Sequence, residues 1–308
     1  MTGLTVLALV VLTLGVAAGA AEPRALNPKD EALLKKLEAR IDAVEARFDG
    51  ALGVAIVDLA SGRELLRLPD EVFPAASLIK VAVLVELLRQ DQSGKGARLA
   101  DSYLVDAKDL VPGSPMLAGM TAGVTRLTNR DLATFMIGVS DNAAANVLID
   151  RVGLEQVNAL LEGLGLRQTR LRRKMMDVAA AKAGLENTAT PGELARLLEK
   201  LQREELLDHT HSEGLLQTLS ATPRKSFLGL PEGVRAATKW GSLEGIRSEA
   251  GIVFATGRPF VIVVMAALAG DEAHAEALIA EIGHAAFETF DRIGRGTPEG
   301  RVLYPREP

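Results

Sequence analysis

Residues 74–88, PAASLIKVAVLVELL, determine how the rest of this 308-residue sequence is interpreted. The apolar run over residues 81–88 predicts a buried helix that begins near Ser77. Ser77 and Lys80 stand three positions apart, so on a helix they share one face and the amine can reach the hydroxyl. If burial lowers the lysine pKa, the pair is a nucleophile with its base. The alternative is a helix-capping serine beside a solvated lysine.

Two further motifs lie downstream, next to predicted secondary structure. Ser140-Asp141-Asn142 separates a helix that ends near Val139 from one that contains residues 143–149. Taken alone, it is an ordinary turn and helix cap. Lys239-Trp240-Gly241-Ser242 follows the strand-like residues 234–238. A lysine there is ordinary at a strand edge, so only the three motifs together, in this order, indicate one site.

The ordered set of motifs resembles the signature of class A β-lactamases and penicillin-binding proteins. The resemblance covers residues 26–290 and implies an α/β (α+β) fold: an antiparallel five-stranded sheet flanked by helices, with an inserted all-helical lobe. It implies that Ser77 attacks a carbonyl, Lys80 accepts its proton and Ser140 relays a proton to the leaving nitrogen.

The resemblance also implies how substrate is held. Asn142 would position the substrate and Lys80, and the backbone N–H groups of Ser77 and Ser242 would form an oxyanion hole. Lys239 would attract a substrate carboxylate, with Arg247 as a possible helper; the alternative for Arg247 is a surface arginine. The implied substrate-binding residues are Asn142, Lys239, Gly241, Ser242 and Arg247.

Two departures from the family pattern stand out. Trp240 replaces the usual threonine or serine, and it either packs on the sheet or reshapes the substrate pocket. Class A deacylation uses a glutamate with an asparagine four residues later, and neither Asp177 nor Glu186 has that partner. Both carboxylates stay candidates for the deacylating base. The alternative is structural: Asp177 pairs with a nearby Arg or Lys, and Glu186 caps toward the helix that begins at Pro191.

Periodicity and turn residues predict the elements around these motifs. Helices are expected over residues 27–48 and 271–290, and hairpins over 51–59 with 63–68 and over 248–255 with 260–267. Between the hairpins the sequence is almost wholly helical, with starts at Thr128, Leu154 and Thr190. We therefore expect a discontinuous α/β lobe (26–75 and 232–293), a helical lobe (76–231) and a tail (294–308).

The first 21 residues resemble a signal peptide. Leu4–Val16 is an apolar run, and Ala18-Gly19-Ala20 offers a cleavage site. Export to the periplasm or the medium is expected, with no stable membrane anchor once the segment is removed. The alternative is an uncleaved anchor. The chain has no cysteine, which excludes disulfides and a lipid-modified cysteine.

Composition and motifs exclude several other chemistries. The net charge of −5 comes from interspersed charges and does not favour nucleic acid. No Gly-x-Ser-x-Gly elbow or Gly-rich phosphate loop occurs, so no cofactor is expected. No metal is expected either, because the four histidines lack metal-ligand spacing; they are His209, His211, His274 and His284.

Three functions follow as hypotheses. The first is a monomeric β-lactamase that is acylated at Ser77 by a β-lactam amide and freed by water. The second is a penicillin-binding-like or esterase/peptidase acyl enzyme, acting on esters or peptidoglycan peptides, with weak β-lactam turnover. The third is a non-catalytic cell-wall-binding homologue, which would have no need of both Ser77 and Lys80.

Overall fold

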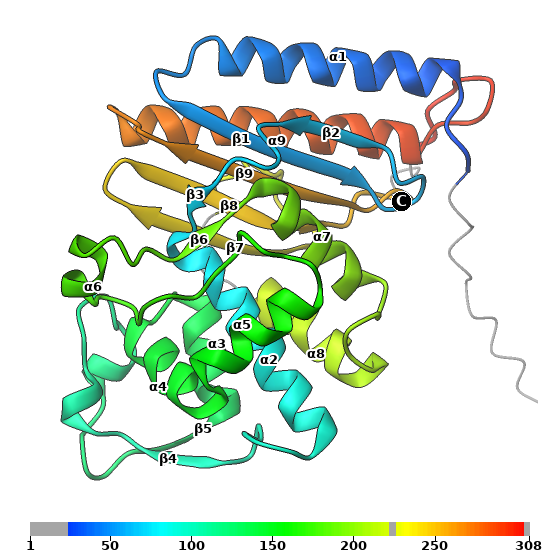
Figure 1. Cartoon of the computed structure of the whole chain (residues 1–308). Coiled ribbons are helices and arrows are strands. Elements are labelled where there is room, and N and C mark those ends of the chain that lie inside the picture. Colours follow the sequence, from blue (N-terminus) through cyan, green and yellow to red (C-terminus); the bar gives the residue numbers. More distant parts are fainter. Residues whose placement is uncertain (1–23, 222–225, 305–308) are drawn as a thin grey trace, which may run out of the picture.

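A five-stranded antiparallel sheet lies at the centre of the computed structural model, which describes residues 24–221 and 226–304 (Figure 1). The strand order is β2-β1-β9-β8-β7. β1 pairs with β9 along its whole length, so strands from the two ends of the sequence lie side by side. This confirms the predicted five-stranded sheet. The strands are β1 (Ala51–Asp58), β2 (Glu64–Arg67), β7 (Ala236–Leu243), β8 (Ile246–Val253) and β9 (Phe260–Ala267).

Helices α1 (Pro28–Glu45) and α9 (Glu272–Gly294) cover one face of the sheet (Figure 1). Leu34, Leu37 and Ile41 recur at helical spacing on α1 and are buried with β1 side chains such as Val54 and Ile56. On α9, Phe290 stacks on Phe260 of β9 with ring centroids 4.5 Å apart. The two predicted outer helices are confirmed, although α9 runs past Phe290 and α1 ends before Phe48.

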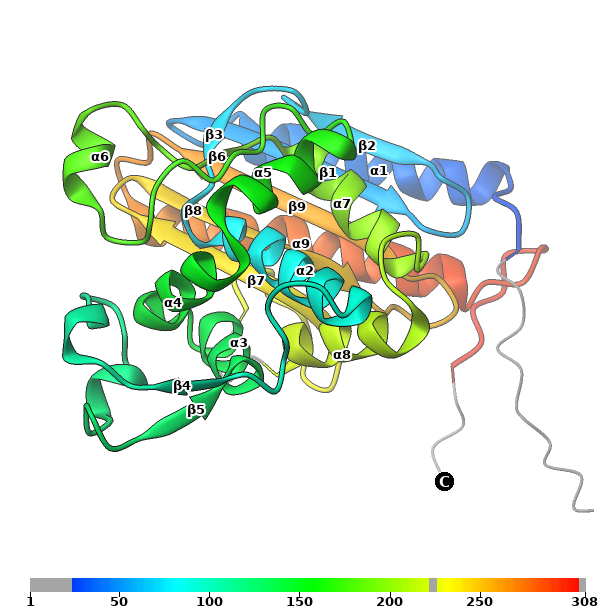
Figure 2. The same cartoon turned by 60° about the horizontal axis from the view of Figure 1, so that its bottom comes forward.

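The opposite face of the sheet packs on the helical lobe (Figures 1 and 2). β9 is buried at all eight positions, because its alternate side chains enter two different cores. Val261 and Val263 join the core of the helical lobe, whereas Ile262 and Val264 face α1 and α9. The lobe's helices are α2 (Lys80–Ser93), α3 (Asn129–Gly138), α4 (Asn142–Val152), α5 (Leu154–Gly163), α6 (Val178–Lys182), α7 (Pro191–Gln202) and α8 (His209–Ser220).

Two of the three helix starts predicted in the helical lobe coincide with side-chain caps, whereas α5 begins at Leu154 after Gly153 without one. Thr128 caps α3 and forms a reciprocal capping box with Asp131. Thr190 caps α7, directly before Pro191. Four short strands were not predicted, since two or three residues give no periodicity. They form two small antiparallel pairs, β3 (Phe73–Pro74) with β6 (Thr188–Ala189) and β4 (Ser102–Leu104) with β5 (Arg126–Thr128).

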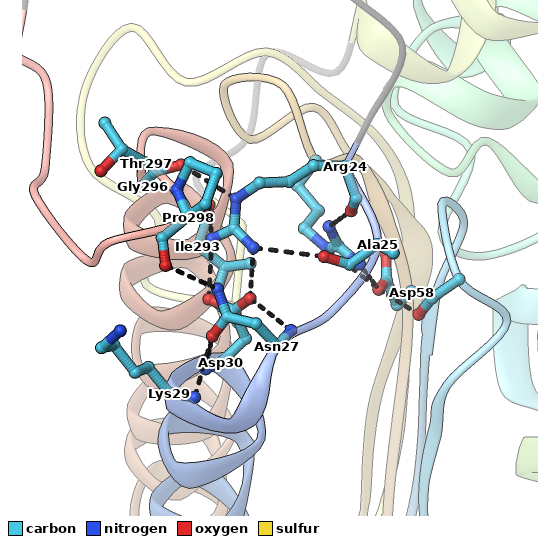
Figure 3. Close-up of polar contacts among 12 residues, drawn as sticks. Arg24, Ala25, Asn27, Lys29, Asp30, Asp58, Ile293, Gly296, Thr297 and Pro298 are labelled. Atoms are coloured by element: carbon cyan, nitrogen blue, oxygen red, sulfur yellow. Dashed lines mark hydrogen bonds and ion pairs between the residues drawn. The ribbon is translucent and has the colours of Figure 1, made fainter.

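A polar cluster ties the start of the described chain to its end (Figure 3). The Arg24 guanidinium donates to the carbonyl of Gly296 at 2.9 Å and pairs with Asp30 at the start of α1. Arg258, fully buried, pairs with Asp58 at 2.6 Å and donates to the carbonyl of Arg24 at 2.8 Å. These contacts fix residue 24 against the end of the sheet. The signal peptide predicted over residues 1–21 lies outside the described residues.

None of the helices within residues 24–221 and 226–304 has the length and apolar character needed to cross a bilayer.

Candidate active site

Ser77 lies in a single 3-10 turn, Ala76–Ile79, that leads directly into α2. The preceding Ala76 adopts a left-handed backbone with φ of +45°, an uncommon conformation for a residue with a side chain. β7 passes close to this turn at Gly241. A Cβ on Gly241 would lie 3.1 Å from the Ala76 Cβ and 3.2 Å from the Ser77 backbone nitrogen. Glycine therefore lets the strand approach the serine backbone.

Lys80 occupies the first turn of α2 and is completely buried. Its ammonium nitrogen donates to the Ser140 carbonyl at 2.7 Å, to Asn142 Oδ1 at 2.7 Å and to Ser140 Oγ at 3.1 Å. Burial lowers the pKa of Lys80 to about 7, with the nearby Asp141 carboxylate acting in the opposite direction. A substantial fraction of this amine is therefore neutral near neutral pH.

Ser140 connects the lysine to the serine. Its hydroxyl donates to Ser77 Oγ at 2.9 Å, and it also lies within hydrogen-bond distance of the Lys80 nitrogen. Among the described residues, hydrogen bonds thus link Lys80 to Ser77 by way of Ser140. Ser140 has a left-handed backbone, with φ of +58°. This strained turn aims the hydroxyl at Ser77.

Asp141 and Asn142 hold that turn in place. The buried Asp141 carboxylate caps α4 at Ala144 and accepts the backbone N–H groups of Met116 and Leu117 at 2.9 and 3.1 Å. Asn142 donates through Nδ2 to the Pro112 carbonyl at 3.0 Å. Sequence reasoning quoted Asp141 within its motif but gave it no separate role; its position as a helix N-cap was the available signal.

A cavity of about 220 Å³ opens beside Ser77. Ser77, Asn142 and Ser242 supply hydroxyl and amide groups to its lining, so the structure brings residues of all three motifs to one crevice. Most of the remaining wall is apolar. The apolar lining consists of Ala76, Met175, Met176, Val178, Ala181 and Leu243.

The two candidate carboxylates differ in position. Asp177 is exposed and caps α6 by accepting the Ala180 N–H at 2.9 Å. It is not among the residues that line the cavity. Glu186 does line it, and Glu186 Oε1 accepts from Arg173 Nη2 at 2.7 Å. The Arg173 pair, rather than a helix cap, accounts for the position of Glu186.

Buried asparagines fix the loop that forms the cavity wall, residues 170–188. Asn146 on α4 binds both the backbone N–H and the carbonyl of Met175, at 2.7 and 3.0 Å. Asn187 accepts the N–H of Arg173 at 3.0 Å and returns a bond to its carbonyl at 3.0 Å. Sequence reasoning missed both asparagines, because their partners lie elsewhere in the chain and no local pattern marks them.

Lys239 and Arg247 have different surroundings. Lys239 is fully buried and donates to the Trp240 carbonyl at 2.7 Å. Its ammonium nitrogen lies 4.4 Å from the centroid of the Trp240 ring, which packs against the core under α1 and α9. Lys239 is not among the residues that line the Ser77 cavity. Arg247 donates to Glu276 at 2.7 Å and also pairs with Glu272, both on α9. The structure therefore does not bring Arg247 into the Ser77 cluster.

Comparisons with known proteins place the chain among enzymes of one kind. The model of the β-lactamase enzyme family matches residues 36–290. A β-lactamase of Streptomyces fradiae is 30% identical over 266 residues, covering 83% of this chain and 87% of that protein. A β-lactamase of Streptomyces albus G is 28% identical, covering 82% and 84%.

Solved structures give the same result. A β-lactamase from Sphaerobacter thermophilus is 30% identical with a TM-score of 0.75, covering 83% of this chain and 97% of that one. An ancestral class A β-lactamase is 30% identical with a TM-score of 0.76, covering 82% and 100%. PBP-A is 27% identical with a TM-score of 0.75, covering 84% and 97%.

Proposed function

We propose, since this chain belongs to the β-lactamase enzyme family, that it hydrolyses the amide bond of β-lactams through a covalent acyl-enzyme on Ser77. The observation that carries the proposal is the hydrogen-bonded series Ser77, Ser140 and Lys80, with the Lys80 pKa lowered to about 7. A base needs a substantial neutral fraction at the working pH to accept a proton, and a buried lysine with such a pKa meets that condition near pH 7.

Acylation begins when Ser77 Oγ attacks the β-lactam carbonyl carbon. The serine proton passes through the Ser140 hydroxyl to neutral Lys80, and the carbonyl oxygen becomes an oxyanion. The backbone N–H groups of Ser77 and Ser242 would stabilise that charge. When the carbon–nitrogen bond breaks, the proton returns through Ser140 to the leaving nitrogen, which leaves an ester on Ser77 and an opened ring.

Deacylation requires water to attack that ester with a base nearby. Among the described residues that line the cavity, Glu186 carries the single carboxylate. We therefore assign it the role of base in deacylation. Glu186 Oε1 already accepts from Arg173 Nη2 at 2.7 Å, so the carboxylate must bind the attacking water while it holds this partner. Hydrolysis of the acyl-enzyme is therefore expected to limit turnover.

The test combines two substrates and intact-mass measurement. The enzyme should open a chromogenic cephalosporin catalytically and should carry a transient mass adduct on Ser77 after mixing with penicillin G. Ser77→Ala should remove both signals. An adduct that persists in the Ser77→Ala variant would reject Ser77 as the nucleophile, and a wild-type protein without adduct or turnover would reject the function.

We also propose that residues 1–21 direct export and are removed, on the basis of the apolar run and the small residues after it. Expression of the full chain in a bacterium should then yield a periplasmic or secreted protein that lacks about these residues. A cell-associated protein that keeps its first residues would contradict the proposal.

A further inference from the structure

The loop of residues 170–188 contributes an apolar wall to the cavity beside Ser77, and the proposed reaction gives that wall no role. Met176 and Val178 line the cavity from this loop, and Leu243 lines it from the end of β7. Met176 is 41% exposed and Val178 is 53% exposed. Apolar side chains that gather beside a reaction site and stay in contact with water favour a ligand that covers them.

The backbone holds these side chains in a defined place. Met175, which precedes them, is bound by Asn146 through both its N–H and its carbonyl. Met176 has a left-handed backbone with φ of +63°, and its carbonyl accepts the Val178 N–H at 2.9 Å. Asp177, between the two, is the N-cap of α6. A hydrogen-bonded turn therefore presents both side chains to the cavity.

The charged residues of the cavity wall are already paired with each other. Among the described residues that line the cavity, Arg173 and Glu186 are the two that carry charge, and Arg173 Nη2 donates to Glu186 Oε1 at 2.7 Å. A charged substituent that entered the cavity would lose water without gaining a counter-ion of its own. An uncharged apolar substituent would instead remove the surface of Met176 and Val178 from water, which is favourable.

We propose that Met176 and Val178 are specificity-determining residues, which select β-lactams whose acyl side chain is apolar and uncharged. In a penicillin the carbon next to the reacting carbonyl carries the acylamino side chain, so this side chain stays within a few bonds of Ser77 throughout acylation. Methionine is unbranched and adapts to differently shaped groups, so the wall selects for polarity rather than for one shape. The inference rests on the proposed function, because it names the substrate class that the same site prefers.

The first measurement compares penicillin G with carbenicillin, whose benzyl carbon carries an additional carboxylate. Rapid-quench mixing with intact-mass detection gives the second-order rate constant for acylation of Ser77, which the later hydrolysis does not affect. The wild-type protein should react with penicillin G about tenfold faster or more, because the additional carboxylate must leave water at an apolar wall. Equal rate constants for the two penicillins would overturn the inference.

The second measurement makes the wall polar while keeping its shape. Val178→Thr and Met176→Gln each exchange an apolar group for a polar one of similar size. Each should lower the rate constant for penicillin G by about 4-fold, which corresponds to one methylene group no longer buried. 6-Aminopenicillanic acid, the penicillin nucleus without an acyl side chain, should react within about twofold of its wild-type rate constant, because it places no apolar group against the wall. An equal loss for both substrates, which a disturbed loop would cause, or no loss for either, would contradict the proposed selection.

Leu185→Gln is the matched control. Leu185 lies on the same loop and is 49% exposed, but it is not among the residues that line the cavity. Its substitution should leave the rate constants for both substrates unchanged. A loss equal to that of Met176→Gln would argue against a role specific to the cavity wall.

The results also separate this inference from the proposed function. A wild-type protein that penicillin G and carbenicillin acylate on Ser77 at the same rate retains the proposed function and excludes the selection by Met176 and Val178. A wild-type protein that neither penicillin acylates would remove the proposed function, and this inference with it.

Discussion

At the scale of single residues, the lowered pKa of Lys80 makes acylation depend on pH in a defined direction. In the proposed reaction the neutral amine accepts the proton, so the acylation rate should level off above the pKa of about 7. Below it, the rate should fall by about tenfold for each pH unit. Stopped-flow acylation between pH 5 and 9 measures this profile. A rate that is constant through pH 5 would exclude Lys80 as the base.

The same burial has a cost in stability. The folded pKa of Lys80 is about 7 and its unfolded value is 10.5, so between these values the unfolded chain binds more protons and stability rises with pH. Lys80→Met should therefore abolish acylation yet raise the free energy of unfolding at pH 7 by about 1–3 kcal/mol. Urea denaturation at pH 7 measures the change, and a loss of stability would contradict it.

The two loop carboxylates should behave differently when neutralised. Glu186→Gln should slow deacylation by about 10²-fold to 10⁴-fold, the usual contribution of a general base, and leave acylation intact. The lifetime of the penicillin G adduct measures this directly. Asp177→Asn is the matched control, because Asp177 only caps the short helix α6. If both variants cleared the adduct at the wild-type rate, Glu186 would not be the base.

The residues of the site were predictable to different degrees. Ser77, Lys80 and Ser140 lie in short motifs, and the structure joins them by hydrogen bonds as the resemblance implied; their catalytic roles remain predictions. Arg247 was ambiguous because its ion-pair partners lie on α9, and Glu186 because its partner Arg173 lies at the other end of the same loop. Single-sequence patterns describe neighbours along the chain, and pairs across the fold are visible only in coordinates.

At the scale of elements, helix starts were the most predictable feature because caps are local chemistry. Thr128 and Asp131 satisfy each other's backbone N–H groups within one turn of α3. Thr128→Ala should lower the free energy of unfolding by about 1 kcal/mol without changing kinetic constants. Thr134→Ala, on an exposed position of the same helix, should cost less. If urea denaturation gave the same loss of unfolding free energy for both variants, the capping interaction of Thr128 would not contribute to stability.

At the scale of the whole molecule, the buried ion pair of Asp58 with Arg258 connects β1 to the turn before β9. Asp58→Ala would leave Arg258 buried without its carboxylate and should cost about 3–5 kcal/mol. Asp42→Ala is the matched control, because its pair with Arg67 is exposed and should contribute under about 1 kcal/mol. Thermal melting of both variants measures the difference. Similar melting temperatures would contradict the assignment of Arg258 as a buried, paired charge.

The pairing of β1 with β9 has a consequence for how the chain acquires its structure. Ala51 faces Ala267 in that ladder, so the central hydrogen bonds of the sheet join residues separated by most of the sequence. Such distant partners make folding slow. The chain must lose the entropy of closing a long loop before the stabilising contacts between the two strands can form. On the ribosome, β1 can pair with β2 early, but its other edge must wait for β9, which is complete only at Ala267. The helical lobe, whose helices all lie within the continuous stretch 80–220, is therefore expected to form first.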